Sequence, residues 1–473
     1  MAGLYEQMVE DATSFVDASY DEGFKLSPEQ RDAIHLAGIR RRFTTLRHSV
    51  KALDRLATEQ GINDINSLDG VVPLFLPHTA YKSYPLSFLE RNRFDALTRW
   101  LDGLTAIDLS GVDVSGIDSI DDWLRRLEET TELKVNHTFG TTGKLSFVPR
   151  TKEQWRKGIV LSGHSLRDWY GPNTGPDVLN KHLPLIAPTY RYGFSTTARA
   201  LDGMVEYFAG GDDNALFLYP DGFVSADVAS LAGRLSAAAS RGEQGRLELS
   251  PSLLARRDQF AILERERPRA MKEFLTNIQV RFGGRDVYLF GFWPLLSDWA
   301  EEGLAQGVRG LFGPNSVLVT GGGTKGRQFA DGWRERVYEF LGFSNNYDTF
   351  GMSEIVAGNS KCEVGNYHFP PVTVPYVLDV DSGRPLPRTG RQTGRLAVMD
   401  LMPENYWGGL LTGDLVTIGG WSDPCDCGRH GPYLEPDIRR ISDLKGGEDK
   451  INCAGAPDAH DRAVEYLVAQ SAA

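Results

Sequence analysis

The stretch HTFGTTGKLSF, at residues 137–147, is the part of the sequence that decides which fold we expect. Its residues 138–144 include three threonines, two glycines and one lysine. Small residues in succession let backbone N–H groups turn inward around an anion, and threonine hydroxyls and a lysine add donors. The stretch therefore predicts a polyphosphate site, although a surface loop can have the same composition.

This stretch is not a Walker phosphate loop. That motif reads G-x-x-x-x-G-K-[ST], whereas Thr138 occupies the position of its first glycine and Leu145 the position of its final hydroxyl. The sequence also lacks a G-x-G-x-x-G motif placed after the first strand of a βαβ unit. A P-loop kinase and a dinucleotide-binding dehydrogenase are therefore disfavoured.

Length and charge narrow the class of protein. The 473 residues carry a net charge of -12, and 41% of them are hydrophobic. A chain of this length usually folds into roughly two or three compact units. The acidic balance argues against nucleic acid or a membrane as a partner. No run of residues is long and apolar enough for a membrane span, and the acidic start does not resemble a signal peptide, so we expect a cytoplasmic protein.

The pattern of apolar residues predicts helices first and a mixed α/β region after them. Residues 27–60 have helical spacing behind a serine cap, residues 120–130 predict another helix, and the proline-punctuated residues 73–85 are expected to be extended. Short β-rich runs at 183–188, 214–220, 286–292 and 316–323 alternate with helical runs at 225–241 and 326–342. This alternation predicts βαβ units around a largely parallel sheet. Strands and turns at 372–418 predict an antiparallel β-subdomain, which we place at about 370–436.

Three further motifs follow the opening stretch along the chain. They are VTGGGTKGR at 319–327, YDTFGMSE at 347–354 and TGDL at 412–415. In this order, the four segments resemble the adenylate-forming superfamily of acyl-CoA synthetases, adenylation domains and luciferases. The resemblance covers roughly residues 73–455, and it implies a large α/β N-terminal domain with layered βαβ sheets and an antiparallel β-subdomain.

The resemblance assigns two glycine-rich loops to ATP. The first loop wraps the phosphates, with Lys144 and Thr141 acting in catalysis, and its matching residues are Thr138, Gly140, Thr141, Thr142, Gly143 and Lys144. Leu145 replaces the proline that usually follows the lysine in this family. The second loop presents backbone to the adenine, and its matching residues are Gly321, Gly322 and Gly323.

The remaining motifs are expected to complete the nucleotide site. The aromatic-Gly-x-[ST]-Glu motif is matched by Phe350, Gly351, Ser353 and Glu354. By resemblance, Phe350 stacks near the adenine and Glu354 holds Mg²⁺, a hard cation that prefers carboxylate oxygen. Asp414 in TGDL would accept hydrogen bonds from the ribose hydroxyls.

A narrower likeness points to phenylacetate-CoA ligases and to the acyl-protein synthetases of bacterial bioluminescence. GGGTKG at 321–326 resembles the latter, and CDCGR at 425–429 resembles a motif of both. The segment FGFWPLLSDWAEEG at 290–303 resembles the part of these proteins that walls the acid pocket. Phe292 and Trp293 are candidates for that wall, with core packing as the alternative for each.

The four cysteines of the chain all lie in its last quarter, which disfavours a disulfide framework. Cys362, His368, Cys425 and Cys427 form the Cys₃His set that suits tetrahedral Zn²⁺, and some relatives in the phenylacetate-CoA ligase group carry similarly placed ligands. Cysteines that simply fill the core are the alternative. A zinc ion here would be structural.

The reaction implied by the resemblance is the ATP-dependent, AMP-forming activation of a small acid, which we expect to be aromatic. It forms an acyl-adenylate and needs no protein nucleophile. The acceptor of the second step stays open among CoA, a carrier-protein thiol and an amine, and Cys453 is either an acyl acceptor or a buried thiol. Other readings are a diazotase that adenylates nitrite, as in branches of secondary metabolism, and a degenerate nucleotide-binding regulator.

The resemblance also predicts the division into domains. We expect a large ATP- and acid-binding domain at 1–436, a hinge at 437–450 and a remnant of the small C-terminal domain at 451–473. Arg440 and Asp443 resemble the hinge residues of the family, and Arg440 is expected near the nucleotide. Because most of the C-terminal domain is missing, the chain is either truncated or a minimal form like the bioluminescence synthetases.

Overall fold

The computed structural model describes residues 3–138, 144–169, 175–241, 251–320 and 327–441. Several predicted residues lie outside these ranges, namely Gly140, Thr141, Thr142, Gly143, Gly321, Gly322, Gly323, Asp443 and Cys453. The predicted hinge is described only as far as residue 441, and the predicted remnant at 451–473 not at all. The division into domains therefore stays a prediction.

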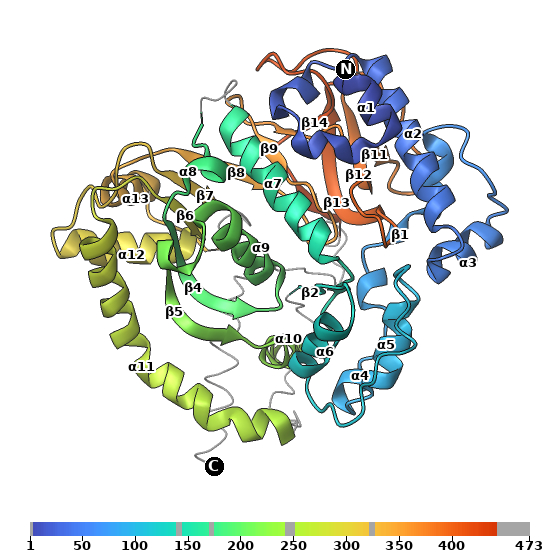
Figure 1. Cartoon of the computed structure of the whole chain (residues 1–473). Coiled ribbons are helices and arrows are strands. Elements are labelled where there is room, and N and C mark those ends of the chain that lie inside the picture. The colour runs from blue at the N-terminus through green and yellow to red at the C-terminus, as the bar shows by residue number, and fades with distance from the viewer. Residues whose placement is uncertain (1–2, 139–143, 170–174, 242–250, 321–326, 442–473) are drawn as a thin grey trace.

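Five strands form the parallel part of a 13-stranded sheet (Figure 1), in the order β5-β4-β6-β7-β8. Their bounds are β4 (Leu185–Gly193), β5 (Ala215–Val224), β6 (Tyr288–Gly291), β7 (Val317–Thr320) and β8 (Asn346–Phe350). Neighbouring strands in this set all pair in parallel. The predicted βαβ organisation is confirmed.

The same sheet continues into an antiparallel part through the pairing of β8 with β9. The antiparallel strands are β9 (Asn359–Lys361), β10 (Tyr367–His368), β14 (Tyr433–Leu434), β13 (Gly409–Gly419), β12 (Gln392–Asp400) and β11 (Thr373–Leu378). Two short strands join β13 from outside this order, β1 (Leu76–Pro77) in parallel and β15 (Arg439–Arg440) antiparallel. The predicted antiparallel strands are therefore present, and the structure adds that they are continuous with the parallel ones.

Alternate residues of the parallel strands face two different hydrophobic cores. Leu185 and Ala187 of β4 pack on the side of α7 (Lys152–Asp168) and α9 (Thr196–Met204). Ile186, between them, faces the opposite core, which is covered by the helices α11 (Pro251–Phe282), α12 (Trp293–Ala305) and α13 (Trp333–Leu341). A central strand with apolar residues on both faces is typical of a parallel sheet covered by helices.

The remaining helices lie mostly before the parallel sheet in the chain. They are α1 (Leu4–Glu10), α2 (Pro28–Leu46), α3 (Lys51–Glu59), α4 (Ser87–Glu90), α5 (Phe94–Asp102), α6 (Ile120–Thr130), α8 (Val178–Lys181) and α10 (Ala226–Arg241). Both α6 and α10 confirm predicted helices. The helix expected at 326–342 begins later, at Trp333.

The helix expected at 27–60 is two helices, α2 and α3. Its start is as predicted, because Ser27 and Gln30 form a capping box. The helix ends after Leu46, whose carbonyl accepts the N–H groups of Ser49 and Val50. Val50 is fully buried, so we attribute the break to a turn that brings this side chain into the core.

Three buried basic residues of α2 attach the N-terminal segment to the antiparallel part. Arg31 donates to the carbonyl of His430 over 3.3 Å, and Arg42 donates to the carbonyl of Leu401 over 3.0 Å. His35 Nε2 lies 3.1 Å from the carbonyl oxygen of Pro371. These bonds satisfy carbonyl groups at the ends of strands and turns, so the first 70 residues are part of the same folded unit.

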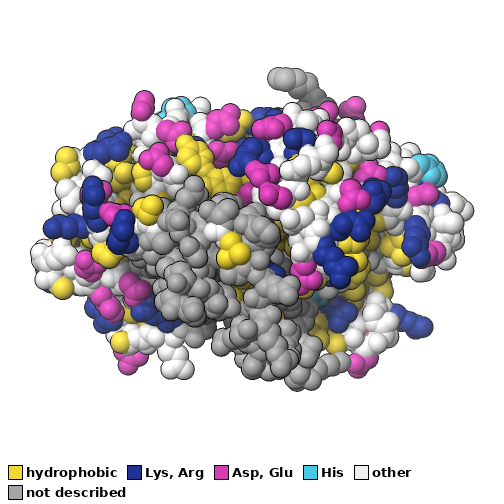
Figure 2. Space-filling model, turned by 90° about the horizontal axis from the view of Figure 1, so that it is seen from below, with side chains coloured by type: hydrophobic (Ala, Val, Ile, Leu, Met, Phe, Trp, Pro, Cys, Tyr) yellow, Lys and Arg dark blue, Asp and Glu magenta, His cyan; other side chains and the backbone are white. Residues whose placement is uncertain are grey.

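The surface carries both signs of charge. Figure 2 shows basic and acidic side chains interspersed over the described part of the face seen from below. A continuous basic surface of the kind that binds nucleic acid is not seen there. None of the helices in the described ranges combines the length and the apolar character that crossing a membrane requires.

The helices α6 and α10 cap each other through two buried aspartates. The Asp227 carboxylate of α10 accepts the N–H groups of Ile120 and Asp121 over 2.9 and 3.2 Å. Asp121 of α6 accepts the N–H of Ala226 over 2.7 Å and the hydroxyl of Ser225 over 2.6 Å. Each carboxylate thus satisfies donors in the first turn of the other helix.

This reciprocal cap predicts a pH dependence of stability. Burial and the nearby Asp121 carboxylate raise the pKa of Asp227 to about 8. Between the ordinary aspartate value and pH 8 the folded group holds a proton that the unfolded chain has lost. The free energy of unfolding should therefore fall with rising pH in this window, by at most about 1.4 kcal/mol per pH unit from this group. Denaturant titrations at a series of pH values should show that the free energy of unfolding of Asp227→Asn changes less with pH than that of the wild type. An unchanged pH dependence would contradict the assignment. Asp221→Asn, at an exposed position, is the control.

Candidate functional site

A short hairpin closes the base of the predicted phosphate loop, residues 138–144. β2 (Asn136–His137) pairs antiparallel with β3 (Phe147–Val148). Beyond β2, the N–H of Thr138 donates to the carbonyl of Ser146 over 3.1 Å, and the N–H of Ser146 donates to the Thr138 hydroxyl over 3.2 Å. The two ends of the loop are therefore held together by described residues.

Lys144, at the end of the loop, lies over an aromatic ring. Its ammonium nitrogen is 5.4 Å from the ring centroid of Tyr84, whose hydroxyl donates to the carbonyl of Leu145 over 2.8 Å. Leu145 is fully buried in the cluster that contains Tyr84 and Phe147. The leucine that replaces the usual proline thus anchors the loop through the core. Burial and the nearby Lys82 lower the pKa of Lys144.

The turn that carries Glu354 is fixed from two sides. The buried Arg150 guanidinium donates to the carbonyl of Ser353 over 2.9 Å and also to that of Ile355. The Thr196 hydroxyl donates to the Ser353 hydroxyl over 2.8 Å and itself accepts from the Asn136 side chain of β2 over 2.8 Å. This chain of bonds joins the base of the phosphate loop to the third predicted motif.

The Glu354 carboxylate is half-buried among basic groups. Burial raises its pKa, and Arg150, His78 and Lys82 partly oppose that shift. In the described ranges no ion pair within 4 Å involves Glu354. A cation beside this carboxylate would stabilise its ionised form. Mg²⁺ is usually bound by one or two carboxylates together with phosphate oxygens, and the basic groups would suit those phosphates.

Asp414 and Arg440 meet across a strand pair. Their residues are direct partners in the β13–β15 register, and Arg440 Nε lies 3.2 Å from Asp414 Oδ1. The N–H of Asp414 donates to the Thr412 hydroxyl over 3.1 Å. Burial raises the pKa of Asp414, which Arg440 and His78 oppose. A methyl group added at Gly413 would lie 3.5 Å from His78 Cε1, so His78 is close to the turn that carries Asp414.

Phe350 and Gly351 lie at the carboxyl end of β8. Phe350 is half-buried, with its ring centroid 6.2 Å from that of Tyr367, and Gly351 is exposed. The Tyr367 hydroxyl donates to the Asp348 carboxylate over 3.0 Å. Asp348 and Trp293 line a small cavity of about 180 Å³. The lining of this cavity also includes Asn346, the first residue of β8, but not Phe350 or Gly351, so the aromatic motif does not form it.

The two candidates for the acid pocket differ in their surroundings. Trp293 is 4% exposed and its ring centroid lies 5.1 Å from that of Trp333. It therefore belongs mainly to the core between α12 and α13. Phe292 is half-buried and its ring lies 5.5 Å from Phe290. A role for Phe292 in binding an acid stays a prediction.

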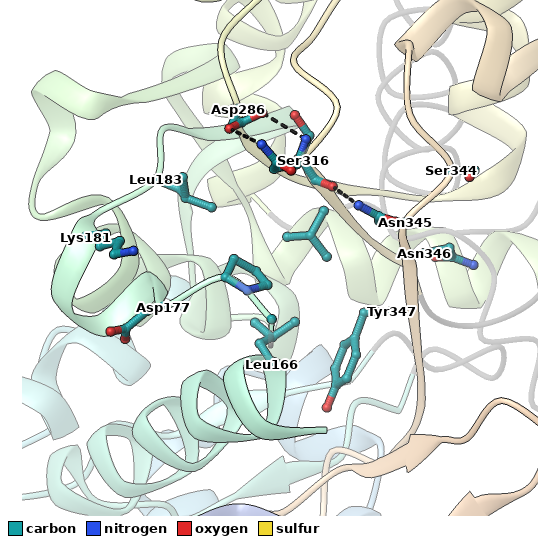
Figure 3. A pocket seen from close by; sticks show the side chains of 14 residues that line it. Leu166, Asp177, Lys181, Leu183, Asp286, Ser316, Ser344, Asn345, Asn346 and Tyr347 are labelled. Atoms are coloured by element: carbon teal, nitrogen blue, oxygen red, sulfur yellow. Dashed lines mark hydrogen bonds between the residues drawn. The ribbon is translucent and has the colours of Figure 1, made fainter. Parts of the chain in front are cut away.

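A larger cavity of about 660 Å³ lies elsewhere (Figure 3). Its lining includes Ser316, Val317, Asn345 and Asn346. These residues lie at the amino ends of β7 and β8, whereas the predicted motifs follow the carboxyl ends of the same strands. The larger cavity is therefore not the site that the motifs form.

The described site also contains basic residues that the motifs did not single out. His78 and Lys82 come from the segment 73–85, which the sequence predicts only to be extended, and Arg150 follows β3. The basic residues within PHTAYKSYP at 77–85 are the signal that could have drawn attention to this segment.

The predicted zinc ligands come together. One ligand atom from each of Cys362, His368, Cys425 and Cys427 lies within 4.8 Å of the other three. Cys427 Sγ is 3.4 Å from His368 Nε2. Tight turns follow two of the cysteines, because the N–H of Gly365 donates to the carbonyl of Cys362 and that of Gly428 to the carbonyl of Cys425. The donor set and its spacing fit tetrahedral Zn²⁺.

Hydrogen bonds from Cys362 and His368, with Arg429 nearby, lower the pKa of the Cys427 thiol, so this sulfur is poised as a thiolate ligand. His368 is fully buried, between the rings of Phe24 and Trp169 at 5.8 and 5.7 Å. A metal here would join the turn after β9, strand β10 and the turn at 425–428, beside the rings of Phe24 and Trp169. That placement suits a structural role.

Comparison with solved structures identifies the fold. An open conformation of 2-hydroxyisobutyryl-CoA ligase in complex with 2-HIB-AMP and CoA matches with a TM-score of 0.50 and 15% identity, covering 90% of this chain and 79% of that one. The same ligase in the postadenylation state with R3-HIB-AMP matches with a TM-score of 0.50 and 16% identity, covering 90% and 72%. No protein-family profile and no curated protein sequence matches the chain.

These matches confirm the α/β fold expected from the resemblance, that of the adenylate-forming ligases. At this level of identity they establish the fold alone. The narrower likeness to phenylacetate-CoA ligases and bioluminescence synthetases stays a prediction.

The metal centre can be tested by removing one ligand. Cys425→Ser should bind less than one zinc per chain by elemental analysis and melt at a lower temperature, because metal binding contributes directly to folding stability. Asp426→Ser is the matched control, since Asp426 is exposed in the same turn. A wild-type protein without zinc, whose melting temperature does not respond to a chelator, would refute the centre.

Proposed function

We propose that this protein is an AMP-forming ligase that uses ATP to activate a small acid as its acyl-adenylate. The single observation that carries this proposal is the chain of hydrogen bonds through Thr196 that joins Asn136, at the base of the predicted phosphate loop, to Ser353, next to Glu354. The fold supports it, because 2-hydroxyisobutyryl-CoA ligase, which has the same fold, was solved with 2-HIB-AMP and CoA.

The reaction would begin when a carboxylate oxygen of the acid attacks the α-phosphorus of ATP in line. The bond to the bridging oxygen breaks, pyrophosphate leaves and the acyl-adenylate remains. Lys144 would neutralise charge on the phosphates, aided by Thr138 at the base of the loop. This catalysis consists of positioning and electrostatic stabilisation, and it requires no covalent bond to the protein.

Glu354 is the residue that would hold Mg²⁺. When bound, the ion would supply positive charge to the phosphates, as Mg²⁺ does in other nucleotide sites. Arg150 would act as a positioning residue, because its bonds to the carbonyls of Ser353 and Ile355 fix the turn that carries the carboxylate. Its guanidinium is buried, and both of these bonds come from Nη2.

Asp414 would bind the ribose. A buried carboxylate can accept hydrogen bonds from two hydroxyl groups, and Arg440 would keep it ionised and oriented through their 3.2 Å ion pair. Phe350 would pack near the adenine from the end of β8. The predicted residues of the two glycine-rich loops complete this proposal, with backbone contacts to the phosphates and the adenine.

For the acid we propose an aromatic substrate, and for the acceptor a thiol such as that of CoA or an amine. The half-buried Phe290 lies near the carboxyl end of β6 and the half-buried Phe292 directly follows this strand, so their rings supply an aromatic surface at that end. The fold shared with a ligase solved with bound CoA supports a thiol acceptor.

The activity can be tested by ATP–pyrophosphate exchange. We expect exchange to depend on an added acid within a panel of aryl and fatty acids, with nitrite plus an aminoaryl acid included. Exchange that requires nitrite would favour a diazotase. ATP binding without exchange for any acid would instead favour a nucleotide-binding regulator, and the proposed ligase would be abandoned.

Glu354→Gln tests the metal-binding carboxylate. The change keeps the size of the side chain and removes its charge, so exchange should fall by roughly two orders of magnitude while the melting temperature stays the same. Because burial raises the pKa of Glu354, wild-type MgATP affinity should also decline on acidification at a higher pH than an ordinary glutamate would give. The MgATP affinity of Glu354→Gln should not show this decline on acidification.

Glu301→Gln is the control, since Glu301 is exposed on α12. Wild-type exchange rates in Glu354→Gln would overturn the assignment of this residue.

A further inference from the structure

Tyr84 belongs to a row of aromatic rings beside the end of the predicted phosphate loop. Its ring centroid lies 4.9 Å from that of Trp100 on α5 and 5.7 Å from that of Phe147 on β3. The ring of Trp123 on α6 packs edge-on against Phe147 at 5.0 Å. Tyr84, Phe147 and Trp123 are fully buried. Core contacts with two helices and a strand therefore hold the Tyr84 ring in place.

Tyr84 contacts the end of the phosphate loop in two ways. Its hydroxyl donates to the carbonyl of Leu145 over 2.8 Å. Its ring centroid lies 5.4 Å from the Lys144 ammonium nitrogen. The first contact fixes the backbone directly after Lys144, and the second holds the end of its side chain. One buried residue therefore constrains the lysine at both its backbone and its charged group.

An aromatic ring is a suitable neighbour for a lysine that must also bind an anion. The negative face of the ring attracts the ammonium without cancelling its charge, and the N–H groups on the side away from the ring stay available. A carboxylate in the same place would compete with a phosphate for the lysine. Burial raises the pKa of Tyr84, so the phenol stays neutral and does not become such a competitor.

We propose that Tyr84 is a positioning residue for Lys144. Its ring and its hydroxyl hold the ammonium in place before the nucleotide binds, so less rotamer entropy is lost when the lysine meets the phosphates. The inference rests on the proposed function, because it takes the phosphates of MgATP to be the ligand of Lys144. The start of the loop is held separately, by the bonds between Thr138 and Ser146.

The placement of the ammonium can be tested without a substrate. Lysines methylated with ¹³C give separate NMR signals, and the signal that disappears in Lys144→Met belongs to Lys144. In the wild type, the ring current of Tyr84 should displace this signal. Tyr84→Leu should remove the displacement, whereas Tyr84→Phe, which keeps the ring, should retain it. A Lys144 signal that is the same in the wild type and in Tyr84→Leu would overturn the inference.

The effect on the reaction can be measured by ATP–pyrophosphate exchange in a double-mutant cycle. Tyr84→Leu should lower the exchange rate roughly tenfold, the usual size for losing a partly desolvated cation–π contact. In a Lys144→Met background the same substitution should have little effect, because the lysine through which it acts is gone. Phe94→Leu is the matched control, since it removes a ring from the same hydrophobic cluster. This control should lower the melting temperature and leave exchange unchanged.

Equal losses from Tyr84→Leu in the two backgrounds would indicate a structural role and would also overturn the inference. If Tyr84→Leu does not fold, Tyr84→Met gives the same comparison. A wild-type protein without exchange would refute the proposed function itself. The NMR comparison would still decide whether Tyr84 holds the ammonium, so the two failures are distinguishable.

Discussion

The burial of the Glu354 carboxylate among basic side chains is the constraint on which the candidate site depends. A half-buried carboxylate is costly to ionise unless cations surround it. The fold meets this requirement with residues from separate segments, since Arg150 follows the hairpin of the phosphate loop and His78 and Lys82 precede it. Arg150 donates from Nη2 to backbone carbonyls of the turn, so it fixes the position of the carboxylate, and its charge also favours the ionised carboxylate. A bound magnesium nucleotide would place a cation beside this carboxylate.

Much of this arrangement follows from local sequence. The helix at α6 has the predicted bounds because its serine cap and apolar spacing agree. The strands β4 to β7 follow from apolar runs separated by helical ones. The four residues of the Cys/His cluster were grouped from residue type, spacing and the resemblance. Where the predicted helix boundaries were wrong, the cause lies in tertiary contacts and backbone conformation. The break between α2 and α3 reflects the burial of Val50, and the late start of α13 at Trp333 follows Gly332, which has a left-handed backbone.

The contribution of residues 76–84 could not be predicted for a different reason. Two residues of β1 give no periodic signal, and their partner strand begins at Gly409, far along the chain. Only the pairing with β13 brings His78 beside Gly413 and so reveals the segment as a wall of the site. The motifs, by contrast, were recognisable because each needs particular residues in a fixed local order. Sequence therefore indicated the candidate groups for the chemistry, and long-range pairing determined which groups surround them.

The continuity of the sheet has a consequence for how the chain folds. β8 hydrogen-bonds to β7 on one side and to β9 on the other, so the parallel and antiparallel parts share a strand instead of meeting at a surface. Separating them would break backbone hydrogen bonds and expose strand edges. The basic residues of α2 tie the N-terminal segment to the same antiparallel strands. The described parallel and antiparallel strands should therefore unfold together, because neither part can leave without breaking the ladder at β8.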